Sequence, residues 1–167
     1  MEKRISLSPK LLAVIALCLV IVIGVTAWFN NTDRNTDGST LMLLVNGEEK
    51  ASYSIKELMG MEKTTVHAEL QSGKSEDEKG DFTGVTLELL LKTANIKNCE
   101  TVIMTAGDGY SSAAKSSEAK DVLIAYEKDG DTLGYYEKGG TGPLRCIFFK
   151  DAYGNRSVQY LTKIDCR

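Results

Sequence analysis

The sequence predicts an α+β domain over residues 41–167, preceded by one transmembrane helix. Segments that alternate apolar and polar residues, as strands do, are interspersed with segments that have apolar residues at helical spacing. Turn signals separate these segments, which gives about six or seven strands and two or three helices. Before the domain, residues 11–29 form an apolar run that contains no charge.

The uncharged run at residues 11–29 is long enough for a helix to cross the hydrocarbon core of a bilayer. Residues 1–10 are basic and residues 30–40 form a polar linker. We therefore expect a single-pass protein of the cell membrane, with a cytoplasmic N-terminus and an extracytoplasmic domain. The alternative is a signal peptide, for which residues 25–27 provide a cleavage site.

The charge balance argues against nucleic acid as a partner. The chain has 20 Lys and Arg against 23 Asp and Glu, and its N-terminal flank holds more basic than acidic residues. The domain is therefore more acidic than the chain as a whole. It also lacks the basic stripe that binding to a phosphate backbone requires.

The first part of the domain begins with a strand and a short helix. The strand at residues 41–45 is followed by Asn46-Gly47, which is typical of a hairpin turn. Ser54 and Glu57 have the spacing of a capping box, so a short helix is expected to begin there.

The next three segments differ clearly in character. Residues 64–71 alternate apolar with polar side chains and predict a half-buried strand. His67, the only histidine of the chain, lies on the polar face of this strand. Residues 72–81 are rich in charge and predict a solvated loop. Residues 84–96 carry leucines at helical spacing and predict a helix that Asn95 can end.

The second half of the domain is predicted to consist mainly of strands. Residues 100–106 form an apolar strand segment, and residues 122–130 form another that ends in a turn. The small-residue segment 111–121 separates them. A glycine-rich loop leads into a further strand at residues 144–150. Residues 156–164 are expected to return as its hairpin partner.

Arg145 stands where the glycine-rich loop becomes an apolar strand. One interpretation is a surface arginine on a half-buried strand. The other is an anion site at the mouth of the strand, since a guanidinium presents a planar fork of donors to an anion.

The domain contains three of the four cysteines of the chain. Cys146 alternates with apolar neighbours and is expected to be a buried, inert thiol. We expect Cys99 and Cys166 to form a disulfide, because the predicted compartment is oxidising. A thiol-redox function remains an alternative, although no CxxC pair occurs and no metal site is indicated.

Residues 82–165 resemble the oxidoreductase molybdopterin-binding domain of the sulfite oxidase family. The resemblance is carried in order by FTGVTLELLLKTANI, an aspartate-glycine turn after ETVIMTA, the strand VLIAYEKDGDTL, and GPLRCIFFKDAYGNRSVQYLTKI. It implies a mixed, mostly antiparallel sheet that can hold molybdopterin. It also implies that Arg145 contacts an anionic ligand and that Gly140 and Gly142 let the backbone approach that ligand closely.

The sequence departs from this family at three positions. The family's molybdenum-ligating cysteine is absent, and Ser72 or a neighbour stands in its place. Gly140 occupies the place of a histidine, and Gln159 that of a lysine. We therefore expect a membrane-anchored module with this fold that binds a small anionic ligand or a partner protein, without metal or molybdenum catalysis. The alternative is a molybdopterin-dependent oxidoreductase or one subunit of such an enzyme.

Overall fold

The computed structural model describes residues 40–71, 77–135, 140–151 and 154–167 of the chain. The expected membrane helix, its flank and nearly all of the linker lie outside these residues. No helix within the described ranges is long and apolar enough to cross a membrane.

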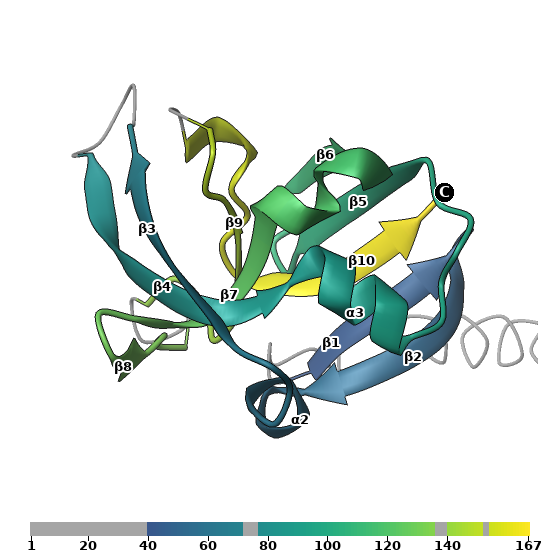
Figure 1. The fold of residues 1–167 in the computed structure, drawn as a ribbon, viewed down its shortest axis with the longest axis horizontal. Helices are drawn as coiled ribbons and strands as arrows, with labels where there is room; N and C mark the ends of the chain where they lie inside the picture. Colours follow the sequence, from purple (N-terminus) through teal and green to yellow (C-terminus); the bar gives the residue numbers. More distant parts are fainter. Residues whose placement is uncertain (1–39, 72–76, 136–139, 152–153) are drawn as a thin grey trace, which may run out of the picture. The chain divides into compact units, whose positions relative to one another are not determined.

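The described part of the domain is built from two sheets (Figure 1). The first sheet has the order β2-β1-β10-β5-β6, and its strands are β1 (Thr40–Val45), β2 (Glu48–Ser54), β5 (Thr101–Ala106), β6 (Ser111–Lys115) and β10 (Leu161–Cys166). The second sheet has the order β3-β4-β7-β8, with β9 also paired to β7. Its strands are β3 (Thr64–Leu70), β4 (Glu78–Thr86), β7 (Val122–Lys128), β8 (Asp131–Thr132) and β9 (Arg145–Phe148).

The paired strands are antiparallel except for β1 and β10, which are parallel. A mixed, mostly antiparallel, sheet-dominated α+β fold is therefore confirmed. The β1–β2 hairpin turns at Asn46 (φ 53°) and Gly47 (φ 82°), the conformation that favours an Asn-Gly pair.

The prediction that residues 156–164 form a hairpin with β9 is wrong. A single bridge joins Cys146 to Val158, and β10 instead lies between β1 and β5. The cause is burial, because Leu161, Ile164 and Cys166 are fully buried in this central position. An apolar strand buries more of its surface between two neighbouring strands than at the edge of a sheet, and this burial stabilises the fold.

Two further predictions needed correction. Residues 111–115, which were expected only as part of a small-residue segment between two strands, form β6, where Ala114 packs into the core. Residues 78–81, expected as loop, form the beginning of β4. Pairing with a neighbouring strand outweighs the weak strand preference of such small and charged residues.

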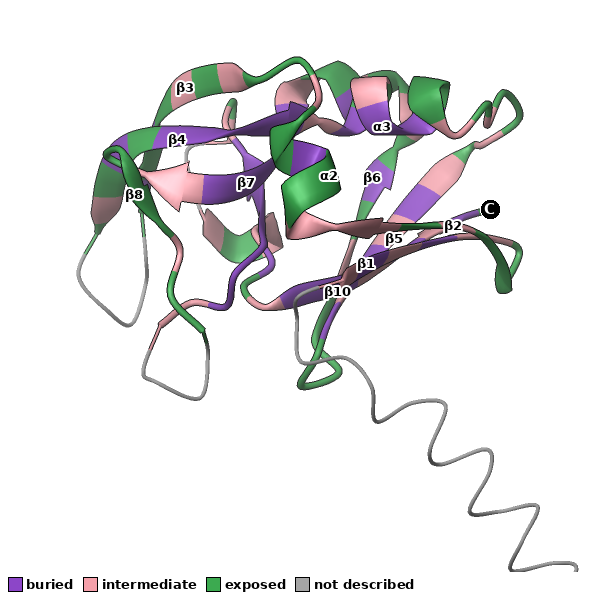
Figure 2. Cartoon of the chain, turned by 90° about the horizontal axis from the view of Figure 1, so that it is seen from below, coloured by how far each residue is buried: buried purple, intermediate pink, exposed green. Residues whose placement is uncertain are grey.

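Two helices follow their strands with clear capping signals. Ser54 caps α2 (Ile55–Met59) in the predicted capping box with Glu57. α3 (Leu87–Thr93) is capped by Thr86 and ends before Asn95, whose φ is 56°. As Figure 2 shows, α3 covers one face of the first sheet. Its residues Leu87, Leu90 and Leu91 are buried.

The core consists of two clusters. The larger one joins α3 to the first sheet and also takes in Tyr126, Leu144 and Phe148. The smaller one belongs to the second sheet and contains Ala68, Leu70, Phe82, Leu123, Ala125 and Ile147. β9 contributes to both clusters, since Cys146 and Phe148 belong to the larger and Ile147 to the smaller. Arg145, the first residue of β9, is therefore placed beside the smaller cluster.

Candidate functional site

Arg145 is almost completely buried, with 4% of its surface exposed. It begins β9 and pairs with Ala125 of β7. The interpretation as a surface arginine is therefore wrong. A buried guanidinium needs partners, because an uncompensated charge inside a protein is strongly disfavoured.

One partner of Arg145 is Glu78, a residue of the charged segment that was expected to be a solvated loop. Arg145 Nη1 donates to Glu78 Oε2 at 2.7 Å, and Lys128 Nζ donates to Glu78 Oε1 at 2.9 Å. Both cations lie 5.6 Å from the centre of the Phe82 ring. Glu78, Lys128 and Arg145, the ion triad, thus lie next to Phe82 of the smaller core cluster.

The ion triad determines the charge state of Glu78. Burial alone would raise its pKa, but the positive charge of Arg145 and the hydrogen bonds from Lys128 and Arg145 together outweigh burial. The pKa of Glu78 therefore lies below its usual value, and the carboxylate stays ionised at neutral pH.

Arg145 also lines a cavity of about 250 Å³, which we call the Arg145 cavity. Its other walls are the turn between β5 and β6 and the segment before β10. The residues that line it are Ala106, Asp108, Tyr110, Arg145, Gly154, Ser157 and Gln159. Gln159, which the resemblance aligned with a cofactor contact, thus lies in the same cavity as Arg145.

Two polar atoms of the Arg145 cavity residues lack a partner. Arg145 Nε and Ser157 Oγ are the buried side-chain polar atoms without a hydrogen bond among the residues that the structure describes. Unpaired buried polar atoms are rare, and each one destabilises the fold unless something else satisfies it. Both atoms belong to residues that line the Arg145 cavity, which makes this cavity the candidate site.

Side-chain contacts brace the walls of the Arg145 cavity. Tyr110 donates its hydroxyl to the carbonyl of Asn155 at 2.6 Å, which ties the β5–β6 turn to the opposite wall. Arg156 binds Glu118 and Asp151 and lies 4.2 Å from the centre of the Phe148 ring. These contacts hold the segment that carries Ser157.

The two glycines predicted to approach a ligand serve the packing of the loop itself. Gly142 has a φ of 86°, and a Cβ there would meet the backbone of Tyr160. A Cβ on Gly140 would collide with Gly134. Neither glycine is among the residues that line the Arg145 cavity.

The remaining predicted residues lie away from the cavity or outside the described ranges. Ser72 lies outside the described residues. Cys99 and Cys166 are joined in a disulfide with a Cα–Cα distance of 5.5 Å. The disulfide lies near Thr101, the first residue of β5, whereas the cavity lies at the other end of this strand, at Ala106. Cys146 is the buried free thiol, and burial raises its pKa.

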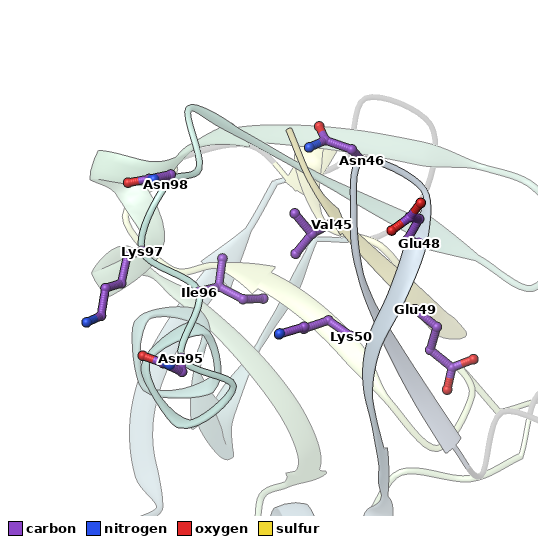
Figure 3. A pocket seen from close by; sticks show the side chains of 9 residues that line it. All are labelled: Val45, Asn46, Glu48, Glu49, Lys50, Asn95, Ile96, Lys97 and Asn98. Carbon is purple, nitrogen blue, oxygen red and sulfur yellow. The ribbon is translucent and has the colours of Figure 1, made fainter.

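A second, larger cavity of about 520 Å³ lies between the β1–β2 hairpin and the loop after α3 (Figure 3). Val45 and Lys50 point from the hairpin toward this loop, which presents Ile96. Lysines and glutamates both line the cavity, and no buried polar atom there lacks a partner among the described residues. It therefore offers less evidence for a ligand than the smaller Arg145 cavity.

Sequence reasoning missed Glu78, Ser157 and Asp108. The alternation of Glu78, Gly80 and Phe82 on one face of β4 was the available signal for the first. The other two lie in irregular segments, where side-chain periodicity gives no guidance.

Comparison with known proteins identifies the fold. Residues 31–167 match the family model of the oxidoreductase molybdopterin binding domain. None of the curated protein sequences matches this chain. Among solved structures, the sulfane dehydrogenase SoxCD from Paracoccus pantotrophus is similar, with a TM-score of 0.64 and 16% sequence identity. The similarity covers 76% of this chain and only 37% of that one. The chain belongs to the family of the oxidoreductase molybdopterin binding domain.

Proposed function

We propose that this chain is a membrane-anchored, extracytoplasmic binding module that holds a small ligand with an anionic group in the Arg145 cavity, without molybdenum catalysis. One observation carries the proposal: Arg145 Nε and Ser157 Oγ are buried, lack a partner and belong to residues of one cavity. A ligand oxygen that reached either group would accept a hydrogen bond from it.

The energetics favour such an arrangement. A hydrogen bond to a charged group contributes about 1.5–3 kcal/mol, and an unsatisfied buried donor destabilises by about as much. A ligand acceptor in the Arg145 cavity would form such a hydrogen bond and would also remove the cost of the unsatisfied donor. The buried position of Arg145 strengthens the interaction further, because water screens it poorly.

The cysteines of the described domain do not fit a molybdenum site. Cys99 and Cys166 are joined in a disulfide, and the thiol of Cys146 is buried with a raised pKa. A soft metal held by sulfur needs an accessible thiolate, which none of these three residues offers. The sequence of residues 72–76 contains no cysteine either.

The volume of the Arg145 cavity also argues against a pterin cofactor. Pockets for drug-sized ligands have volumes of about 300–1,000 Å³. The cavity of about 250 Å³ is smaller, so it suits a ligand of few heavy atoms better than a pterin cofactor.

Family membership supports one alternative, a molybdopterin-dependent oxidoreductase or a subunit of one. Such a subunit would exchange electrons with a redox partner protein. Because one fold serves many functions, the residues of the site decide between the two.

Molybdenum and pterin content test the proposal directly. We expect the full-length chain, made in a molybdenum-replete host that synthesises the cofactor, to carry far less than one molybdenum per chain by mass spectrometry. Pterin fluorescence after oxidation should likewise stay at background. Near-stoichiometric molybdenum would establish the oxidoreductase alternative instead.

The same preparation should bind acetate, a probe with one carboxylate. Ser157→Ala removes one proposed donor, and we expect it to weaken acetate binding about tenfold in a titration followed by NMR. Ser52→Ala on the exposed edge strand β2 is the matched control and should leave binding unchanged. Equal binding by the Ser157 and Ser52 variants would remove Ser157 from the site.

The membrane topology is a separate part of the proposal. It rests on the uncharged run at residues 11–29 and the basic flank before it. Protease added to intact cells or spheroplasts is expected to degrade residues 30–167. Complete protection in intact cells, with digestion after lysis, would place the domain on the cytoplasmic side.

A further inference from the structure

We infer that the ligand of the Arg145 cavity is a small zwitterion, with a carboxylate toward Arg145 and a cationic group toward Asp108. This inference rests on the proposed function and adds the class of ligand. It follows from the charges at the cavity and from its size.

The positive pole is limited to one unit of charge. Glu78 occupies Nη1 of Arg145 and also binds Lys128, so the ion triad combines two cations with one anion. The net charge of one unit matches a single carboxylate. A dianion such as sulfate would carry one negative charge more than the ion triad offsets.

The negative pole is Asp108, in the turn between β5 and β6. Its Oδ1 accepts a hydrogen bond from the backbone N–H of Tyr110 at 3.0 Å, which fixes the orientation of the carboxylate. Asp108 has no ion-pair partner among the described residues. Arg145 and Asp108 are the only charged residues in the cavity lining that belong to the described part of the chain.

The other lining residues suit a compact polar molecule. Ser157 and Gln159 add a hydroxyl and an amide, and among the described residues Ala106 is the one aliphatic side chain in the lining. A ligand with a large apolar group would find little surface to cover. An amino acid of the size of alanine has both charged groups on one carbon and a side chain of one methyl group.

The experiment compares two probes on the full-length protein in detergent at neutral pH. L-alanine has both charges, whereas acetate has only the carboxylate. We expect L-alanine to bind wild-type protein about tenfold more tightly than acetate, because the second charged hydrogen bond is made only by the zwitterion. Dissociation constants come from NMR titrations of both probes.

Asp108→Asn isolates the negative pole, because asparagine keeps the oxygen that accepts from the Tyr110 N–H. We expect this variant to lose the preference for L-alanine while binding acetate as wild type does. Asp131→Asn, on the exposed strand β8, is the matched control and should keep the preference.

Each outcome has a defined meaning. If wild-type protein binds acetate as tightly as L-alanine, or if Asp108→Asn keeps the preference, the zwitterion inference is wrong and the proposed function stands. If neither probe binds, both are wrong. A preference that is lost in Asp108→Asn and kept in Asp131→Asn supports the inference.

Discussion

Replacing Cys99 by serine is expected to lower the free energy of unfolding by about 4 kcal/mol. The disulfide joins residues that are 67 positions apart in the sequence. In the chain-entropy description, closing a loop of this length removes many conformations from the unfolded state. It also ties the loop before β5 to the end of β10. Denaturation by guanidinium chloride under oxidising conditions measures the loss.

Reduction supplies the control for this prediction. A reducing agent should destabilise wild-type protein by about the same amount and should leave Cys99→Ser unaffected. Cys146→Ala keeps the disulfide and removes only one buried sulfur atom, so we expect a loss of about 1 kcal/mol. If wild-type protein is equally stable with and without reductant, the disulfide contributes nothing.

The second large effect is expected at the ion triad. Glu78→Ala leaves Arg145 buried beside Lys128, two cations without their shared carboxylate. Breaking a buried pair by removing one partner destabilises by about 3–5 kcal/mol. The side chain of Glu78 is 28% exposed and that of Arg145 only 5%, so we expect a loss near the lower end, about 3 kcal/mol.

A double variant separates the ion pair from simple packing. Glu78→Leu combined with Arg145→Leu replaces both charges by apolar side chains, and we expect it to be more stable than Glu78→Ala. Lys128 remains in the double variant but is 29% exposed and can reach water. A loss below about 0.5 kcal/mol for Glu78→Ala would mean that the pair behaves like an exposed surface pair.

Acid should weaken the ion triad and so lower the free energy of unfolding. The pKa of Glu78 is lowered in the folded protein, so its contribution to stability is complete above the pKa of an unfolded glutamate, about 4.3. That contribution is lost as the pH falls through the lower, folded pKa. Glu78→Gln lacks the titrating group, so its stability should fall less steeply than that of wild type below about pH 4.

Local sequence patterns predicted much of the fold. The Asn46-Gly47 turn, the capping box at Ser54, the alternation in β3 and the helix end at Asn95 all depend on neighbours within a few residues. The partner of β10 could not be predicted in this way. A buried strand carries no local mark of which strands will flank it, and an adjacent apolar run looks like a hairpin partner.

In the candidate site, too, features set by neighbouring residues could be predicted, and contacts between distant segments could not. The sequence left open whether Arg145 lies at the surface or at an anion site, and its burial excludes the surface interpretation. Glu78 lies 67 positions before Arg145, within a run of charges that resembles a solvated loop. The unpaired Ser157 hydroxyl was also beyond prediction, since whether a buried polar atom finds a partner depends on distant segments.

The parallel pairing of β1 with β10 has a consequence for how the domain is made. Met42 can pair with Lys163 only after all the intervening residues have been synthesised. If the domain is threaded across a membrane as proposed, its earliest strand must wait on the far side with an unpaired edge. Pairings so distant in sequence form slowly, and exposed edges invite association with other chains. This domain therefore has reason to depend on a chaperone during export.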